Sequence, residues 1–219
     1  MKEVNAVKFQ AKATADFSIC PVGNHIGICN AVVDLGMQPG SGIYPDPKHQ
    51  VYVRFELPTE PVTYTKDGKE ITGPMSIGRT FTASMSEKAN LRKFIESWFG
   101  KKFPTDDAAA DFDLELLLGK KCLVNVTHSE KGQKTYANIK DATPIPKGMN
   151  SEYPQHNASL FFDLTNRDEG MYNKLPEWLQ KKIAERLSDD KETATKSAQD
   201  EYLGGSGGGF DDSMSDIPF

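Results

Sequence analysis

Between about residues 19 and 140, five short β-strand patterns surround one strongly amphipathic helical segment. The strand patterns fall at residues 25–35, 51–57, 77–85, 121–129 and 133–142, and the helical pattern falls at residues 87–99. The order of three strands, a helix and two strands does not fit the strand–helix alternation of a parallel sheet. It is typical of a small antiparallel barrel or sandwich.

The second strand and the helix carry the clearest periodicities. Val51, Val53, Phe55 and Leu57 alternate with Tyr52, Arg54 and Glu56, so we expect the first set in the core and the second in solvent. On the helix, Leu91, Phe94, Ile95 and Trp98 form one apolar stripe that predicts packing on the barrel.

The element order predicts a mainly β protein with an OB-fold. This fold is a five-stranded Greek-key barrel, here with the helix between strands three and four. SH3-like barrels and partial sandwiches give similar strings, so they stay open as alternatives.

Beyond the barrel, the composition divides the chain into three parts. Residues 1–148 hold the predicted barrel. Residues 149–187 form an extension with a short strand at 160–164 and a helix that opens at Pro176 and packs back through Leu179 and Ile183. Residues 188–219 are polar, acidic and glycine-rich, and we expect a disordered tail.

The charge is concentrated in that tail. The whole chain of 219 residues has a formal net charge of −5, which taken alone argues against binding to nucleic acid. Residues 188–219, however, hold eight acidic residues against two lysines, which leaves residues 1–187 at +1. The barrel and extension are therefore free to present a basic surface.

The chain ends in Asp216-Ile217-Pro218-Phe219, behind a glycine-rich linker and the acidic pair Asp211 and Asp212. This end resembles that of bacterial single-stranded-DNA-binding proteins, although Ser213-Met214-Ser215 interrupts the acidic run. The resemblance implies that the tip recruits replication, recombination and repair enzymes such as nucleases, helicases and primases. Its partner-binding residues would be Asp211, Asp212, Asp216, Ile217, Pro218 and Phe219.

The remainder of the chain is more similar to the OB-fold single-strand binders of bacteriophages. The similarity rests on the segments GRTFTASMSEKANLRKFIESWFGK, LLLGKKCLVNV and KTYANI. It implies a phage protein acting in the cytoplasm of a bacterial host. The three cysteines without a CxxC pair, and an N-terminus without a secretory signal, fit the same compartment, and no membrane association is expected.

Single-strand binding requires a basic groove with aromatic faces for the bases. The predicted DNA-binding residues lie on the solvent faces of the strands and on two loops: Tyr44, Tyr52, Arg54, Tyr64, Arg79, Lys134, Tyr136 and Lys140. Packing beneath a loop is an equal alternative for Tyr52 and Tyr136. For Lys88, Arg92, Lys93, Lys101 and Lys102 a solvated surface is the simpler interpretation.

No catalytic residue, cofactor or metal is expected. The chain lacks a phosphate-binding GxxxxGK[ST] loop, and the helix dipole explains Asp111, Asp113 and Glu115 better than nuclease chemistry does. Cys20, His25 and Cys29, completed by Cys122 or His128, fit no standard zinc spacing. The sequence therefore predicts a non-catalytic protein that binds and protects single-stranded DNA. A protein-binding adaptor or decoy for host repair enzymes, a strand-annealing protein and a homo-oligomer remain open.

Overall fold

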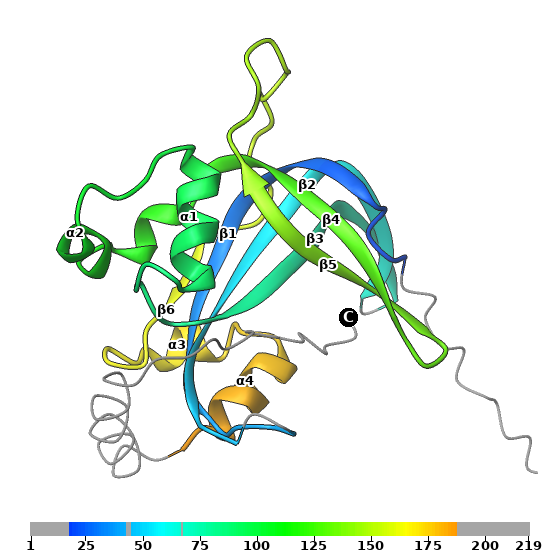
Figure 1. Cartoon of the computed structure of the whole chain (residues 1–219). Coiled ribbons are helices and arrows are strands. Elements are labelled where there is room, and N and C mark those ends of the chain that lie inside the picture. Colours follow the sequence, from blue (N-terminus) through cyan, green and yellow to red (C-terminus); the bar gives the residue numbers. More distant parts are fainter. Residues whose placement is uncertain (1–17, 43–44, 67, 188–219) are drawn as a thin grey trace, which may run out of the picture.

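The computed structural model describes residues 18–42, 45–66 and 68–187 (Figure 1). Its main element is a curled antiparallel sheet that forms a half-barrel, which confirms the expected mainly β, OB-type architecture. The strand order is β3-β2-β1-β4-β5. The five strands are β1 (Gly23–Gln38), β2 (Lys48–Lys66), β3 (Lys69–Thr82), β4 (Lys121–Lys131) and β5 (Lys134–Thr143).

The edge strands β3 and β5 meet through a side chain rather than a ladder of backbone hydrogen bonds. Arg79 on β3 donates from Nη1 to the carbonyl oxygens of Ile139, at 3.3 Å, and Lys140, at 2.9 Å, on β5. We call this junction the seam. It brings together two strands that are far apart in the sequence.

The helix α1 (Asn90–Phe99) lies between β3 and β4 in the chain and packs on the barrel, as predicted. Its apolar stripe is buried, and the Trp98 indole N–H donates to the Lys121 carbonyl at 3.2 Å. The helix begins three residues later than expected, because the Ala89 N–H donates to the Ser86 carbonyl in a turn and Ala89 is the N-cap. Gly100, at φ 63°, ends it in the left-handed conformation that glycine adopts without strain.

The sequence before Gly119 also predicts a short helix over 112–118, where the structure has a 3₁₀ turn, η1 (Leu114–Leu117). A short helix, α2 (Asp106–Ala110), precedes it. The Thr105 and Asp113 side chains accept hydrogen bonds from the backbone at the start of each element. These two caps divide the segment.

The C-terminal extension covers the outer face of β1 and β2. It consists of β6 (Leu160–Phe162), α3 (Glu169–Tyr172) and α4 (Glu177–Ala184). β6 pairs in parallel with the second half of β1, whose first half pairs with β4. This arrangement builds a second core from Ala31, Val33, Leu35, Tyr52, Leu160, Phe162, Leu175, Leu179 and Ile183.

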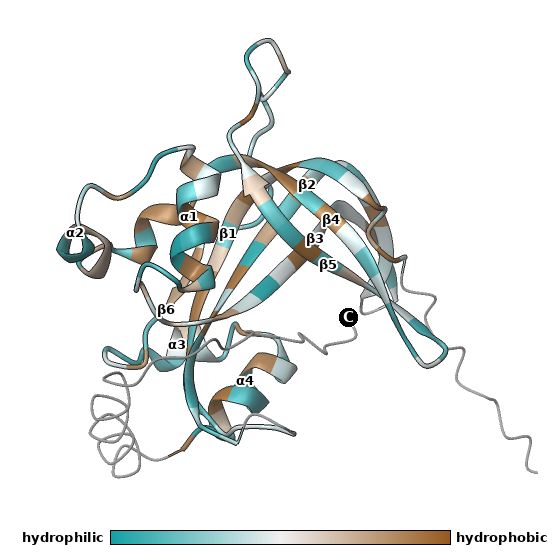
Figure 2. Cartoon of the chain, viewed as in Figure 1, coloured by the Kyte–Doolittle hydropathy of each residue, from teal (hydrophilic) through white to brown (hydrophobic). Residues whose placement is uncertain are grey.

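The second core explains why β1 is buried on both sides along most of its length. Hydrophobic and hydrophilic residues alternate along the strands in Figure 2, but the outer face of β2 is closed where the extension packs against it. No helix in the described ranges is long and apolar enough to cross a membrane.

Candidate nucleic-acid interface

Four side chains of β5 point away from the barrel core. Alternation along β5 places Ala137 and Ile139 against the core, so the residues between them face outward. Lys134 and Lys140 are exposed, and Tyr136 and Asn138 are half-buried. We call the outward set, Lys134, Tyr136, Asn138 and Lys140, the β5 row.

Asn138 orders the middle of the β5 row. Its side-chain amide donates to Ser129 Oγ on β4 at 2.8 Å and to the Tyr136 carbonyl at 3.2 Å. The row therefore presents one half-exposed aromatic ring between two lysines on a firmly paired strand. This is the combination of a stacking surface and positive charge that binds a single nucleic-acid strand.

The sequence predicted Arg79 on a solvent face with Tyr52 and Arg54, but the structure places it on the opposite face of the sheet. It lies opposite Val53 in the register, with its guanidinium carbon 4.7 Å from the centre of the Phe81 ring. Ile77 and Phe81 are buried, and the alternation places Arg79 on their face of β3. Its half-buried guanidinium stands at the seam and holds β5.

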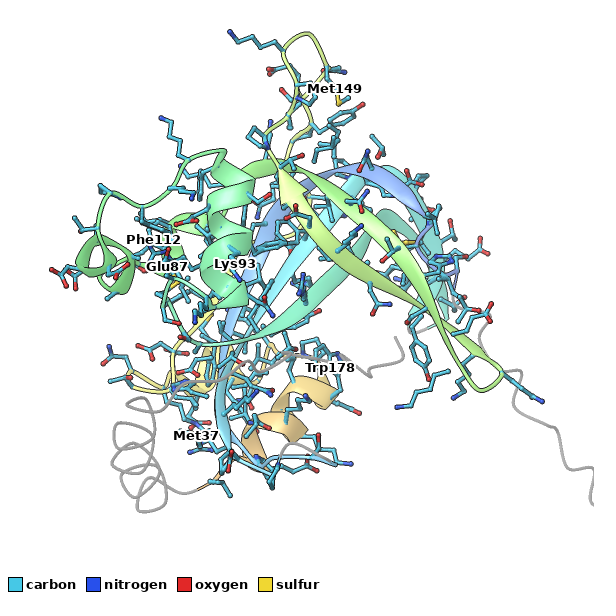
Figure 3. The ribbon with its side chains drawn as sticks, in the orientation of Figure 1. Met37, Glu87, Lys93, Phe112, Met149 and Trp178 are labelled. Carbon is cyan, nitrogen blue, oxygen red and sulfur yellow. The ribbon has the colours of Figure 1, made fainter. Side chains whose placement is uncertain are left out.

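Lys93 adds an exposed cation close to the seam. One turn after it on α1, Ser97 donates to the Asp141 carboxylate of β5 at 3.0 Å. Residues four apart lie on the same side of a helix, so Lys93 is on the side of α1 that faces β5 (Figure 3). The sequence pattern favoured a solvated surface for both Lys88 and Lys93. The docking of α1 on the barrel is what places Lys93 beside β5.

Tyr52 is not available for stacking, so the prediction that its ring faces solvent is wrong. It is 2% exposed, and its ring meets Trp178 of α4 edge to face at 5.0 Å. A Cβ at Gly78 would overlap the Tyr52 ring, so the ring lies directly against β3. Burial raises the pKa of Tyr52 above its ordinary value, and the nearby Arg54 partly offsets this effect.

Glu56 is also buried, although the alternation predicted solvent. Its carboxylate accepts hydrogen bonds from the backbone N–H of His156 at 2.6 Å and of Asn157 at 2.9 Å. Arg54, half-buried on the same face of β2, donates from Nε to Asn30 Oδ1 at 3.0 Å. The extension accounts for both changes, because its connector closes over β2, and local periodicity carries no signal of this contact.

Tyr64 does not join the β5 row. Tyr64 is 47% exposed on the distal part of the β2–β3 hairpin, beyond the irregular pairing between Leu57 and Pro61. Tyr44 lies outside the described residues, as do the six partner-binding residues of the tip. Of the eight predicted DNA-binding residues, the structure places Lys134, Tyr136 and Lys140 on one surface with Arg79 at its edge.

The cysteines considered as zinc ligands are buried, and the two histidines contact other groups. Burial raises the pKa of the Cys20 thiol to about 11 and of the Cys29 thiol to about 12. The His25 ring contacts Glu60 and the Pro21 carbonyl, and the His128 ring contacts the Cys20 carbonyl. Across the described ranges no three His, Cys, Asp or Glu side chains come together in a metal-binding group.

No protein-family model, no curated protein and no solved structure matches this chain. Any functional assignment must therefore be argued from the residues of the barrel and from the C-terminal sequence.

Proposed function

We propose that this protein binds single-stranded DNA, without catalysis and largely without sequence preference, through the β5 row and the seam. The observation that supports the proposal most directly is the placement of Tyr136 between Lys134 and Lys140 on the outer face of an OB-type barrel. Lys93 and Arg79 extend the positive charge toward α1.

Base stacking on Tyr136 favours a single strand over a duplex. Stacking of one base on an aromatic ring contributes about 1–3 kcal/mol, and it requires a base that is not already stacked in a duplex. Each phosphate neutralised on a single strand gives a slope of about −0.7 in log affinity against log salt. Lys93, Lys134 and Lys140 together predict a slope of about −2.

The C-terminal sequence supports a second part of the proposal, recruitment of other enzymes. A free α-carboxylate beside the Phe219 ring, with Asp211, Asp212 and Asp216 upstream, suits a partner pocket with an apolar slot and a basic rim. We therefore place the protein in DNA replication, recombination or repair, in the bacterial cytoplasm that its resemblance to phage proteins implies.

One titration tests the DNA-binding proposal. Fluorescence anisotropy is measured for a labelled oligo-dT of about 16 nucleotides and for a duplex of equal length, at several salt concentrations. Tight, salt-sensitive preference for oligo-dT is expected. No binding at low salt, or equal affinity for the duplex, would reject the proposal and favour an adaptor that binds only protein.

Paired variants test the choice of face. Tyr136→Ala should weaken oligo-dT binding by roughly 5- to 150-fold, the equivalent of one lost stack, whereas Tyr136→Phe keeps the ring and should stay close to the parent protein. Equal loss in both variants would assign Tyr136 a role other than stacking.

A further inference from the structure

Trp178 of α4 lies beside the outer face of β2. Its ring is half-buried against Tyr52, with the two planes at 89°. In the described part of the chain its indole N–H has no hydrogen-bond partner, whereas that of the buried Trp98 is bonded to the Lys121 carbonyl. A tryptophan with one side packed and its polar end in solvent is typical of a binding surface.

Arg54 supplies a positive charge near the buried Tyr52 ring. It is two residues from Tyr52 on β2, so the two side chains share the outer face. Its Nε is bonded to Asn30, and its two terminal nitrogens have no partner among the described residues. These nitrogens are the donors with which arginine binds a phosphate.

The register sets this surface level with the β5 row. Tyr52 lies opposite Thr80 and Arg54 lies opposite Gly78, so Arg79 stands between them on β3. Arg79 is bonded to the carbonyl of Lys140 on β5. β3 therefore lies between β2, which carries Tyr52 and Arg54, and β5, which carries Lys140.

Three buried polar atoms mark the same place. Gln50 Oε1, Tyr52 Oη and Thr80 Oγ1 have no hydrogen-bond partner within the described residues. Alternation puts all three on the outer face of β2 and β3, and the Tyr52 ring among them meets Trp178. Unpaired buried polar groups are uncommon in proteins, and each calls for a partner such as an ordered water.

We propose that Trp178 and Arg54 form a second nucleotide subsite, in which a base stacks on the indole and its phosphate binds the guanidinium. This inference rests on the proposed single-strand binding and extends it. The strand would run from the β5 row across the edge strand β3 to the C-terminal extension. Docking of α4 then does more than close the second core, because it supplies the aromatic surface that burial of Tyr52 removes.

Intrinsic fluorescence tests the proposal in the full-length chain. The protein has two tryptophans, and Trp98 is 2% exposed, so acrylamide should quench mainly the emission of Trp178. Addition of oligo-dT should quench this emission and protect it from acrylamide. In a Trp98→Phe variant, whose folding is checked by thermal unfolding, the same change should persist because Trp178 is then the sole reporter.

Two substitutions separate stacking from packing. Trp178→Leu keeps apolar volume against Tyr52 but removes the aromatic face, and it should weaken oligo-dT binding roughly 5- to 150-fold by anisotropy. Trp178→Phe keeps a face for a base and should bind within about threefold of the parent. Arg54→Gln should lower the salt slope by about 0.7.

The outcomes distinguish the subsite from the function on which it rests. If oligo-dT binds by anisotropy while Trp178 emission and the affinity of Trp178→Leu stay unchanged, the subsite is rejected and the proposed function stands. If oligo-dT does not bind at low salt, both are rejected. Equal weakening of Trp178→Leu and Trp178→Phe, with both variants stably folded, would reject base stacking on this ring.

Discussion

The Glu56 carboxylate on β2 binds Asn157 of the connector twice, accepting hydrogen bonds from its backbone N–H at 2.9 Å and from its side-chain amide at 2.8 Å. The carboxylate is fully buried, and its other oxygen accepts from the backbone N–H of His156. A buried anion that is held by several N–H donors fixes the connector against the barrel. Glu56 therefore joins the extension to the sheet that carries the β5 row.

Glu56→Gln should lower the free energy of unfolding by about 1–3 kcal/mol, because either orientation of the amide sets an N–H group against another donor. Asn157→Ala keeps both backbone donors and should cost about 1 kcal/mol. Chemical denaturation followed by tryptophan emission measures both. Glu70→Gln, an exposed carboxylate on the β2–β3 hairpin, is the matched control and should change stability by less than about 0.5 kcal/mol. An equally small effect of Glu56→Gln would contradict this role.

The inner face of β2 could be predicted from the sequence, and its outer face could not. Val53 and Phe55 follow the alternation of a single strand, and both are buried as expected. Tyr52 and Glu56 follow the same alternation, yet a segment about 100 residues later covers them. The period of a strand separates its two faces, but it does not say how many of those faces are buried.

For the β5 row, the strand alternation predicted the outward direction of the side chains but not the contact with β3. Lys134, Tyr136 and Lys140 were predicted to face outward and do so, with both lysines exposed and Tyr136 half-buried. Arg79 had a usable signal, since Ile77 and Phe81 share its period and mark that face as buried. Its bond to β5 depends on barrel closure, which local sequence does not encode.

Replacement of Lys134 and Lys140 by alanine should reduce the salt dependence of oligo-dT binding. Each lysine that neutralises a phosphate contributes about −0.7 to the slope, so the double variant should be less steep by about 1.4. Anisotropy titrations from low to moderate salt measure the slope. Lys147→Ala, on the exposed loop after β5, removes a charge away from the row and should leave the slope unchanged. A common slope for all three proteins would move the phosphate contacts off β5.

The stability of the α1 surface should fall in acid. Hydrogen bonding from Arg92 holds the pKa of Glu96 below its ordinary value of 4.5, and the two side chains are 3.0 Å apart. Because the folded pKa is the lower one, the stabilising contribution is complete above pH 4.5 and is lost as the pH falls through the folded pKa. Glu96→Gln should therefore be less stable than the parent at pH 7, and the difference should shrink below pH 4.5. Urea unfolding at pH 7 and at about pH 3 measures it, and a constant difference would contradict the assignment.

Removal of residues 211–219 should leave oligo-dT affinity equal or higher. This segment carries Asp211, Asp212 and Asp216, and it is tethered to the barrel, so we expect it to compete with DNA for the lysines at a high effective concentration. The gain should be largest at low salt, because screening weakens the competing contacts. The same truncation should abolish capture of a replication or repair enzyme by the tip. A substitution of Phe219 by alanine separates the two effects, since it removes the apolar anchor while keeping the three carboxylates, and it should abolish capture without raising DNA affinity. Loss of DNA binding in the truncated protein would show that the tail is part of the binding surface and would overturn the division of roles between barrel and tip.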